Sequence, residues 1–456
     1  MLPKPAVAPG NHQPPASGDA FVPGGYTGWQ PPTVPPGLAP ETQAPVWCPL
    51  PDAPGSPFPA YAPPPGFQPL VFVDPGKLGH TTGDLKKPGS LVVVDQFIAP
   101  MPMMGIGGMT GSLETPHGHL VSESATHDGF SGNLIPSEIS SKYGQEKFMI
   151  KQSLNEPGLP PEEFKKRLEL SVALESVSLM DSMSERLEGL KEAGLHGSAV
   201  NLSYGISQAG ILDRFYSDAS LAWAGWGPTS EFKKPLLENY ARAFDLDASK
   251  LSHQDPKIAG PERRKLQQAI ADQVSGTMET HPAVQESHQN YAKAVIELEK
   301  DHNSVVVSAA NYGRVVEYLD QDAGESAPKL RVSSQFHDNV LATPETTVVG
   351  ATDGSGDQEK VAGYSSNFQE VDIYANGVAP KPSLPGQKNA QGTSFAAPKV
   401  AQAMAQLHEL YPEKSSAEIE DMLKEQLSHQ LLSYDGNVQR PVLNEQPDFG
   451  MLSLYT

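Results

Sequence analysis

A serine lies where a helix should begin, in the segment 392–398, GTSFAAP. The amphipathic stretch from Phe395 to Leu407 follows it and is typical of a helix. The amino terminus of a helix has unpaired N–H groups and the positive end of the helix dipole, and both stabilise negative charge that develops during a reaction. Ser394 could therefore be a nucleophile. It could also simply cap the helix, which is the common role of serine at such a position.

Two residues upstream could supply the base that a serine nucleophile needs. The apolar run 91–94, LVVV, predicts a buried strand that ends at Asp95, and the segment 117–122, HGHLVS, contains His117. A neutral imidazole held by a carboxylate can take a proton from a hydroxyl and later return it to a leaving group. Two other interpretations stay open here. Asp95 could end a buried strand at a turn, and His117, His119 and His127 could form a zinc site, although no fourth ligand follows a zinc pattern.

Together these segments resemble the subtilisin-like serine proteases, the subtilase family. Residues 392–398 match its nucleophile motif Gly-Thr-Ser-x-Ala-x-Pro, and 117–122 resembles its His-Gly-Thr-His-Val-Ala segment. The chain order Asp95, His117, Ser394 is also the order of that family. The resemblance implies a catalytic triad of these three residues.

Two further segments resemble the family between the histidine and the serine motifs. Residues 200–205, VNLSYG, resemble its substrate strand, which implies that Ser203, Tyr204 and Gly205 align the peptide backbone. Residues 305–313, VVVSAANYG, resemble the turn that carries the oxyanion asparagine, which implies that Asn311 donates a hydrogen bond to the tetrahedral intermediate. Without the resemblance, these segments could be an ordinary half-buried strand and an ordinary turn.

The sequence departs from the family pattern near these motifs. Gln96 and Phe97 follow Asp95, where a small hydroxylated residue and a glycine are usual. Ile206 replaces a second glycine after Gly205, and Ala310 precedes Asn311 where glycine is common. We expect these changes to affect specificity more than chemistry.

The elements that must hold these residues alternate between short apolar runs and amphipathic stretches. This alternation predicts an α/β fold with a mainly parallel β-sheet flanked by helices, subtilisin-like in type. Strands are predicted at 70–73, 91–94, 199–203, 305–309, 347–350 and 371–374. Helices are predicted at 161–194, 284–301, 394–411 and 415–427.

Three regions differ in composition. Residues 1–66 hold nearly half of the 44 prolines and predict a disordered leader, either a tether or a docking segment for a partner protein. Residues 67–456 predict the peptidase domain. Within it, residues 211–288 are rich in charged, helix-forming residues and predict a mostly helical insertion.

The bulk composition excludes several classes of function. A net charge of −21 disfavours nucleic-acid binding, which requires a basic surface. No apolar run approaches the roughly 20 residues that span a bilayer, and the single cysteine excludes an intramolecular disulfide. No signal peptide is evident, so we expect cytoplasmic residence or export by a signal-independent route. No cofactor is expected. Structural calcium is frequent in the family, but no carboxylate loop for it can be mapped and no metal ligand is assigned.

The sequence therefore predicts a serine endopeptidase that hydrolyses polypeptides through an acyl-enzyme on Ser394. Two alternatives remain at this point. One is a catalytically impaired protease-like module that binds peptides, and the other is an esterase that uses the same nucleophile.

Overall fold

The computed structural model describes residues 85–97, 117–126, 130, 132–139, 142–223, 228–325, 327–354, 359–366, 371–381, 388–432 and 439–445. The predicted leader, the predicted strand at 70–73 and His127 lie outside these residues. The leader and its boundary at residue 66 therefore stay predictions. In the described part of the chain, no helix is both long and apolar enough to cross a lipid bilayer.

A mostly parallel sheet forms the centre of the described chain. Its strands are β1 (Leu91–Asp95), β2 (Leu134–Glu138), β3 (Ala199–Leu202), β4 (Ser304–Ser308), β5 (Thr347–Asp353), β6 (Lys360–Val361), β7 (Ile373–Asn376), β8 (Ser428–Leu432) and β9 (Gln439–Leu443). Their order is β2-β1-β3-β4-β5-β7-β9-β8, with β6 beside β5. Only the β5–β6 and β8–β9 pairs are antiparallel among these. The predicted class, a mainly parallel sheet flanked by helices, is confirmed.

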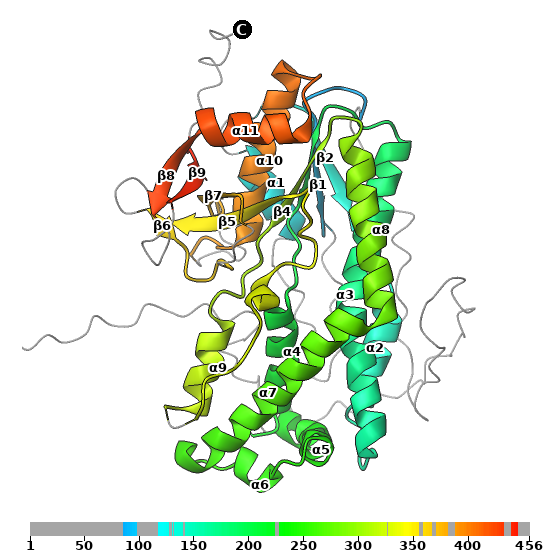
Figure 1. Ribbon diagram of the computed structural model, residues 1–456, viewed down its shortest axis with the longest axis vertical. Helices are drawn as coiled ribbons and strands as arrows, with labels where there is room; N and C mark the ends of the chain where they lie inside the picture. Colours follow the sequence, from blue (N-terminus) through cyan, green and yellow to red (C-terminus); the bar gives the residue numbers. More distant parts are fainter. Residues whose placement is uncertain are drawn as a thin grey trace, which may run out of the picture. The chain divides into compact units, whose positions relative to one another are not determined.

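Helices cover both faces of this sheet (Figure 1). On one face lie α1 (His117–Thr126), α10 (Thr393–Leu410) and α11 (Ser416–Gln426), and on the other α2 (Gly144–Ser153), α3 (Pro161–Glu192) and α8 (Pro282–Glu299). Strand β1 shows why both faces need cover, because its four apolar residues are all fully buried. Leu91 and Val93 pack towards α1 and α10, while Val92 and Val94 pack towards α3 and α8. This alternation follows from the two-residue period of a strand.

A second apolar core lies among helices, most of which come between β3 and β5 in the chain. It is formed by α4 (Gln208–Ser220), α5 (Pro228–Ala243), α6 (Ala248–Leu251), α7 (Pro256–Thr280), α9 (Val315–Ala323), the 3-10 helix η2 (Ser334–His337) and the first half of α3. Helices α4 to α7 occupy the stretch where the sequence predicted a helical insertion, and α8 matches the helix predicted at 284–301. Phe164 and Leu168 of α3 belong to this second core, whereas Val177 and Leu187 of the same helix pack on the sheet. Helix α3 thus joins the insertion to the sheet.

Three neighbouring strands bring the predicted site residues to one edge of the sheet. Strands β1, β3 and β4 run parallel and adjacent, in register from Leu91 through Ala199 to Ser304. Their carboxyl ends therefore lie together, and polar side chains that follow them meet there.

Candidate active site

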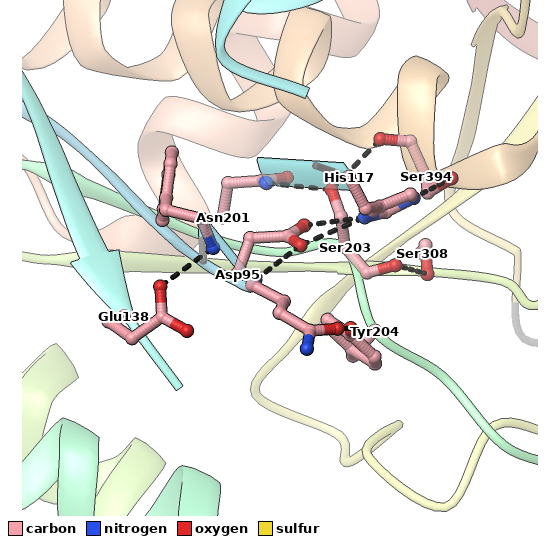
Figure 2. Close-up of polar contacts among 10 residues, drawn as sticks. Asp95, His117, Glu138, Asn201, Ser203, Tyr204, Ser308 and Ser394 are labelled. Atoms are coloured by element: carbon pink, nitrogen blue, oxygen red, sulfur yellow. Dashed lines mark hydrogen bonds and ion pairs between the residues drawn. The ribbon is translucent and has the colours of Figure 1, made fainter. Parts of the chain in front are cut away.

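The three residues of the predicted triad form one hydrogen-bonded chain (Figure 2). His117 Nδ1 lies 2.8 Å from Asp95 Oδ1 and 3.0 Å from Oδ2, and His117 Nε2 lies 3.0 Å from Ser394 Oγ. A carboxylate can only accept hydrogen bonds, so the ring proton of His117 is on Nδ1, and this N–H donates a hydrogen bond to Asp95. Nε2 then accepts the hydrogen bond from the Ser394 hydroxyl. The imidazole is therefore in the tautomer that a general base needs, with its unprotonated nitrogen facing the serine hydroxyl.

Asp95 is placed by its strand and by its neighbour. It is the last residue of β1, its side chain is 0% exposed, and the backbone N–H of Gln96 donates to its Oδ1 at 2.6 Å. His117 is the first residue of α1 and remains 35% exposed at its side chain. Burial lowers the pKa of His117, but the charge and the hydrogen bond of Asp95 together outweigh burial, so the pKa lies above its ordinary value.

Ser394 does not cap its helix. Gly392 is the N-cap residue of α10, which leaves the Ser394 side chain free to face His117. The Ser394 carbonyl accepts a hydrogen bond from Ser203 Oγ at 2.9 Å, and Asn201 Nδ2 donates to that Oγ at 2.8 Å. The capping explanation for this serine is therefore wrong, and the end of β3 holds the first turn of α10 in place.

Asn311 lies beside the same serine. Its Oδ1 accepts from the backbone N–H of Thr393 at 2.8 Å and from Thr393 Oγ1 at 3.0 Å. These bonds assign the two ends of the amide, so Nδ2 is the free donor end. A methyl group added to Gly392 would lie 3.0 Å from Ser394 Oγ and 3.1 Å from Asn311 Nδ2. A small space bordered by nucleophile and donor therefore depends on glycine at position 392.

The residues predicted to align a substrate lie near the triad, but the side chains of Ser203 and Tyr204 have other partners. Ser203 holds the Ser394 carbonyl, and the Tyr204 hydroxyl donates to Gln96 Oε1 at 3.0 Å while its ring meets His117 edge-on at 5.8 Å. Burial, with the charges of Asp95 and Glu138, raises the pKa of Tyr204, so its hydroxyl stays protonated. Gly205 packs directly against the Asn339 side chain. A role in aligning substrate would fall to the backbone of 203–205 and stays a prediction.

The departures from the family pattern have structural partners here. The Phe97 backbone N–H donates to Glu138 Oε2 at 2.7 Å, and the Phe97 ring meets His119 edge-on at 5.5 Å. Gly118 fits under that ring, with its N–H bonded to the Gln96 carbonyl at 2.9 Å. Gln96 and Phe97 therefore brace Asp95 and the start of α1.

Sequence reasoning missed several supporting residues. Three of them, Thr393, Gly392 and Asn201, lie within the motif segments 392–398 and 200–205. Their positions in these motifs could have indicated a role at the site. Asn339 carried no such signal, because its bond to the Ser308 carbonyl joins residues 31 positions apart. In the described residues, no group of three histidine, cysteine, aspartate or glutamate side chains is arranged to bind a metal. His127 of the alternative zinc site lies outside them.

In this α/β fold, an aspartate, a histidine and a serine are hydrogen-bonded in that order at the carboxyl ends of parallel strands. This is the arrangement of a serine hydrolase. Residues 265–445 match the model of the subtilase family, peptidase S8, which confirms the resemblance for the motifs at 305–313 and 392–398. The matched segment contains Asn311 and Ser394 and supports a serine peptidase. Asp95, His117 and the segment 203–205 lie before it.

Several solved structures are also similar to this chain. A cold-adapted subtilisin-like serine proteinase is 12% identical over 81% of this chain and 92% of its own, with a TM-score of 0.33. Sphericase is 13% identical over 76% of this chain and 84% of its own, with a TM-score of 0.33. The S41 psychrophilic protease is 13% identical over 79% of this chain and 90% of its own, with a TM-score of 0.34. No curated protein matches the chain.

Proposed function

We propose that this protein is a serine endopeptidase that hydrolyses polypeptides through an acyl-enzyme on Ser394. The observation that carries the proposal is the unbroken chain of hydrogen bonds from Asp95 through His117 to Ser394 Oγ, with Asn311 Nδ2 beside that oxygen. This arrangement unites a nucleophile, a base, an orienting carboxylate and an oxyanion donor.

In the first half of the reaction, Ser394 Oγ attacks the carbonyl carbon of the peptide and His117 Nε2 takes the hydroxyl proton. The oxyanion of the tetrahedral intermediate accepts hydrogen bonds from Asn311 Nδ2 and from the Ser394 backbone N–H. Collapse of the intermediate breaks the C–N bond, and His117 gives its proton to the leaving amine. Asp95 keeps the imidazole in the correct tautomer and stabilises its positive charge.

In the second half, water attacks the acyl-enzyme. His117 takes a proton from the water, the oxyanion again lies at Asn311, and the proton passes to Ser394 Oγ as the acyl group leaves as a carboxylic acid. The backbone of Ser203, Tyr204 and Gly205 aligns the substrate by main-chain hydrogen bonds.

A fluorophosphonate probe tests the nucleophile. The purified chain should be labelled on Ser394, whereas Ser394→Ala should not be labelled and His117→Ala should be labelled far more slowly. An unlabelled native protein would remove the proposal and favour the impaired peptide-binding module. Labelling combined with hydrolysis of esters but not of denatured casein or a peptide library would favour the esterase.

A further inference from the structure

The turn that carries Asn311 has a strained backbone. Ala310 adopts φ 72°, a left-handed conformation that residues with a Cβ rarely adopt. Such a conformation persists only where surrounding contacts hold it. On one side, the 364–366 loop holds the turn, because the Ser366 N–H donates to the Ala310 carbonyl and the Gly313 N–H to the Tyr364 carbonyl, both at 3.1 Å.

The helical insertion holds the other side of the turn through Tyr312, the residue after Asn311. The Tyr312 ring lies directly on Gly210 of α4. A Cβ added at Gly210 would lie 2.5 Å from both Cε2 and Cζ of that ring, which is closer than any real contact. The position therefore accepts only glycine unless the ring moves.

Polar contacts hold Tyr312 at both of its ends. Arg214, one helical turn beyond Gly210, donates to Glu175 Oε2 of α3 at 2.8 Å. Burial lowers the pKa of Arg214, but Glu175 and then the Tyr312 side chain raise it above its ordinary value, which places the guanidinium close to Tyr312. The Glu175 side chain is only 3% exposed and also pairs with Lys147 of α2 at 2.5 Å. At the backbone, His337 Nδ1–H donates to the Tyr312 carbonyl at 3.2 Å. A chain of contacts thus leads from Lys147 of α2 and Glu175 of α3 to Arg214 of α4. Helix α4 contacts Tyr312, the residue that follows the proposed oxyanion donor.

We propose that Tyr312 is a positioning residue, through which Gly210 and Arg214 of the insertion fix Asn311 beside Ser394. On this proposal, the insertion helps to position the oxyanion donor Asn311. This inference rests on the proposed endopeptidase function, since it assigns a role in stabilising that reaction's oxyanion.

A pair of matched glycine variants tests the role of the Tyr312 ring. Gly210→Ala pushes the ring away, whereas Gly276→Ala, in helix α7 of the same insertion, adds a methyl group with no atom within 4 Å. Gly210→Ala should lower kcat by about tenfold or more with KM little changed, because small misplacements of catalytic groups have large effects. Gly276→Ala should behave like the unaltered chain.

The specific readout is the affinity for a peptide aldehyde relative to the matching peptide alcohol. The aldehyde forms a hemiacetal with Ser394 Oγ and places an oxygen in the oxyanion hole, while the alcohol forms no bond to the serine. Gly210→Ala should weaken binding of the aldehyde by about the same factor as kcat and leave binding of the alcohol unchanged. Tyr312→Leu, which removes the ring without crowding α4, should do the same.

An unchanged aldehyde-to-alcohol ratio in either variant that folds, or an equal loss in Gly276→Ala, would overturn the inference. Folding is checked by circular dichroism and thermal unfolding. Failure of the function itself looks different, since the unaltered chain would then react neither with the fluorophosphonate nor with the aldehyde.

Discussion

Helix α10 has a serine–histidine pair near each of its ends, and the two pairs differ in every respect that matters for chemistry. Near the amino end, Ser394 faces His117 at 3.0 Å, and the second nitrogen of that imidazole bonds to Asp95. Near the carboxyl end, His408 Nε2 lies 2.9 Å from Ser304 Oγ of β4. His408 is fully buried, and its Nδ1 has no hydrogen-bond partner in the described part of the chain.

The electrostatic surroundings of the two histidines are opposite. Asp95 raises the pKa of His117 against the effect of burial. Burial, together with the neighbouring His302 and His196, lowers the pKa of His408 to about 4. A serine–histidine hydrogen bond is therefore not enough for nucleophilic catalysis. A carboxylate behind the imidazole and access for a substrate distinguish the pair that could react.

The largest contrast should come from removing each serine in turn. Ser394→Ala should lower kcat by about 10⁶-fold, because the nucleophile and its base act as a unit. Ser304→Ala should leave kcat unchanged and reduce the free energy of unfolding by about 1–3 kcal/mol, because it leaves the buried His408 Nε2 without a partner. Steady-state cleavage of a peptide amide by the folded variants measures both. Equal losses of kcat would mean that the two pairs are not functionally distinct.

Replacing Asp95 should make the Ser394–His117 pair behave more like the Ser304–His408 pair. In Asp95→Asn, an amide N–H can face His117 Nδ1 and favour the tautomer with the proton on Nε2, so the base can no longer accept from Ser394. We expect a loss of about 10⁴-fold in kcat. The acid limb of the kcat/KM profile should also move to lower pH, because Asp95 no longer raises the pKa of His117.

The pH–rate profile measures that shift. In the unaltered chain, activity should fall as pH decreases through a value above 6.5, the ordinary pKa of histidine, since only the neutral imidazole can act as base. A limb at the same pH in both proteins would show that it reports some other group.

The two histidines should have opposite effects on stability as pH changes. The folded-state pKa of His408 is about 4 against 6.5 for a free histidine, so the unfolded chain binds a proton first as pH falls. Stability should decrease by about 3 kcal/mol between pH 6.5 and 4 through this residue. His117 has a raised pKa, so its contribution is present at low pH and disappears as pH rises through the folded value.

Urea unfolding at several pH values separates these effects. His408→Gln should flatten the loss of stability between pH 6.5 and 4 relative to the unaltered chain, while His117→Gln should not. Parallel curves for the unaltered chain and His408→Gln would contradict the role of His408.

The smallest expected effect concerns backbone strain, which lies near the Ser394 pair. Ala310→Gly removes the cost of a left-handed residue, offset by the greater freedom of glycine in the unfolded chain, so the free energy of unfolding should rise by no more than about 1 kcal/mol. Thermal unfolding measures this change. A clear loss of stability would indicate that the Ala310 methyl group, which is buried, contributes packing that outweighs the strain.

Much of the fold could be predicted from the sequence where an element is long or fully buried. The runs LVVV and VVV that became β1 and β4 are continuous and apolar, and the shorter runs that became β3, β5 and β7 are mostly apolar. Helices α3, α8, α10 and α11 have clear periodicity. Strand β2 was missed because Pro136 interrupts its pattern, which is tolerated since β2 lies at the edge of the described sheet. Helix α1 was missed because its sequence, HGHLVSESAT, begins with histidine and glycine and packing must stabilise it.

The candidate site was predictable in its residue types but not in its bonds. Motif matches named Asp95, His117, Asn311 and Ser394, yet periodicity could not reveal that Asn311 bonds to a residue 82 positions away. Those long-range bonds decide which end of the amide faces the serine. The contact between Gly210 and the Tyr312 ring could not be predicted either, because it depends on how helix α4 packs against the turn.

Helix α3 belongs to both apolar cores, and this should couple the unfolding of the insertion to that of the sheet. Its first half contributes Phe164 and Leu168 to the insertion, and its second half contributes Val177 and Leu187 to the sheet layer. A continuous helix transmits loss of order from one half to the other, so the insertion and the sheet should melt in a single cooperative transition. Amide protons of both regions should then exchange with solvent at similar rates. The insertion is better regarded as an inseparable part of one folding unit than as a removable module.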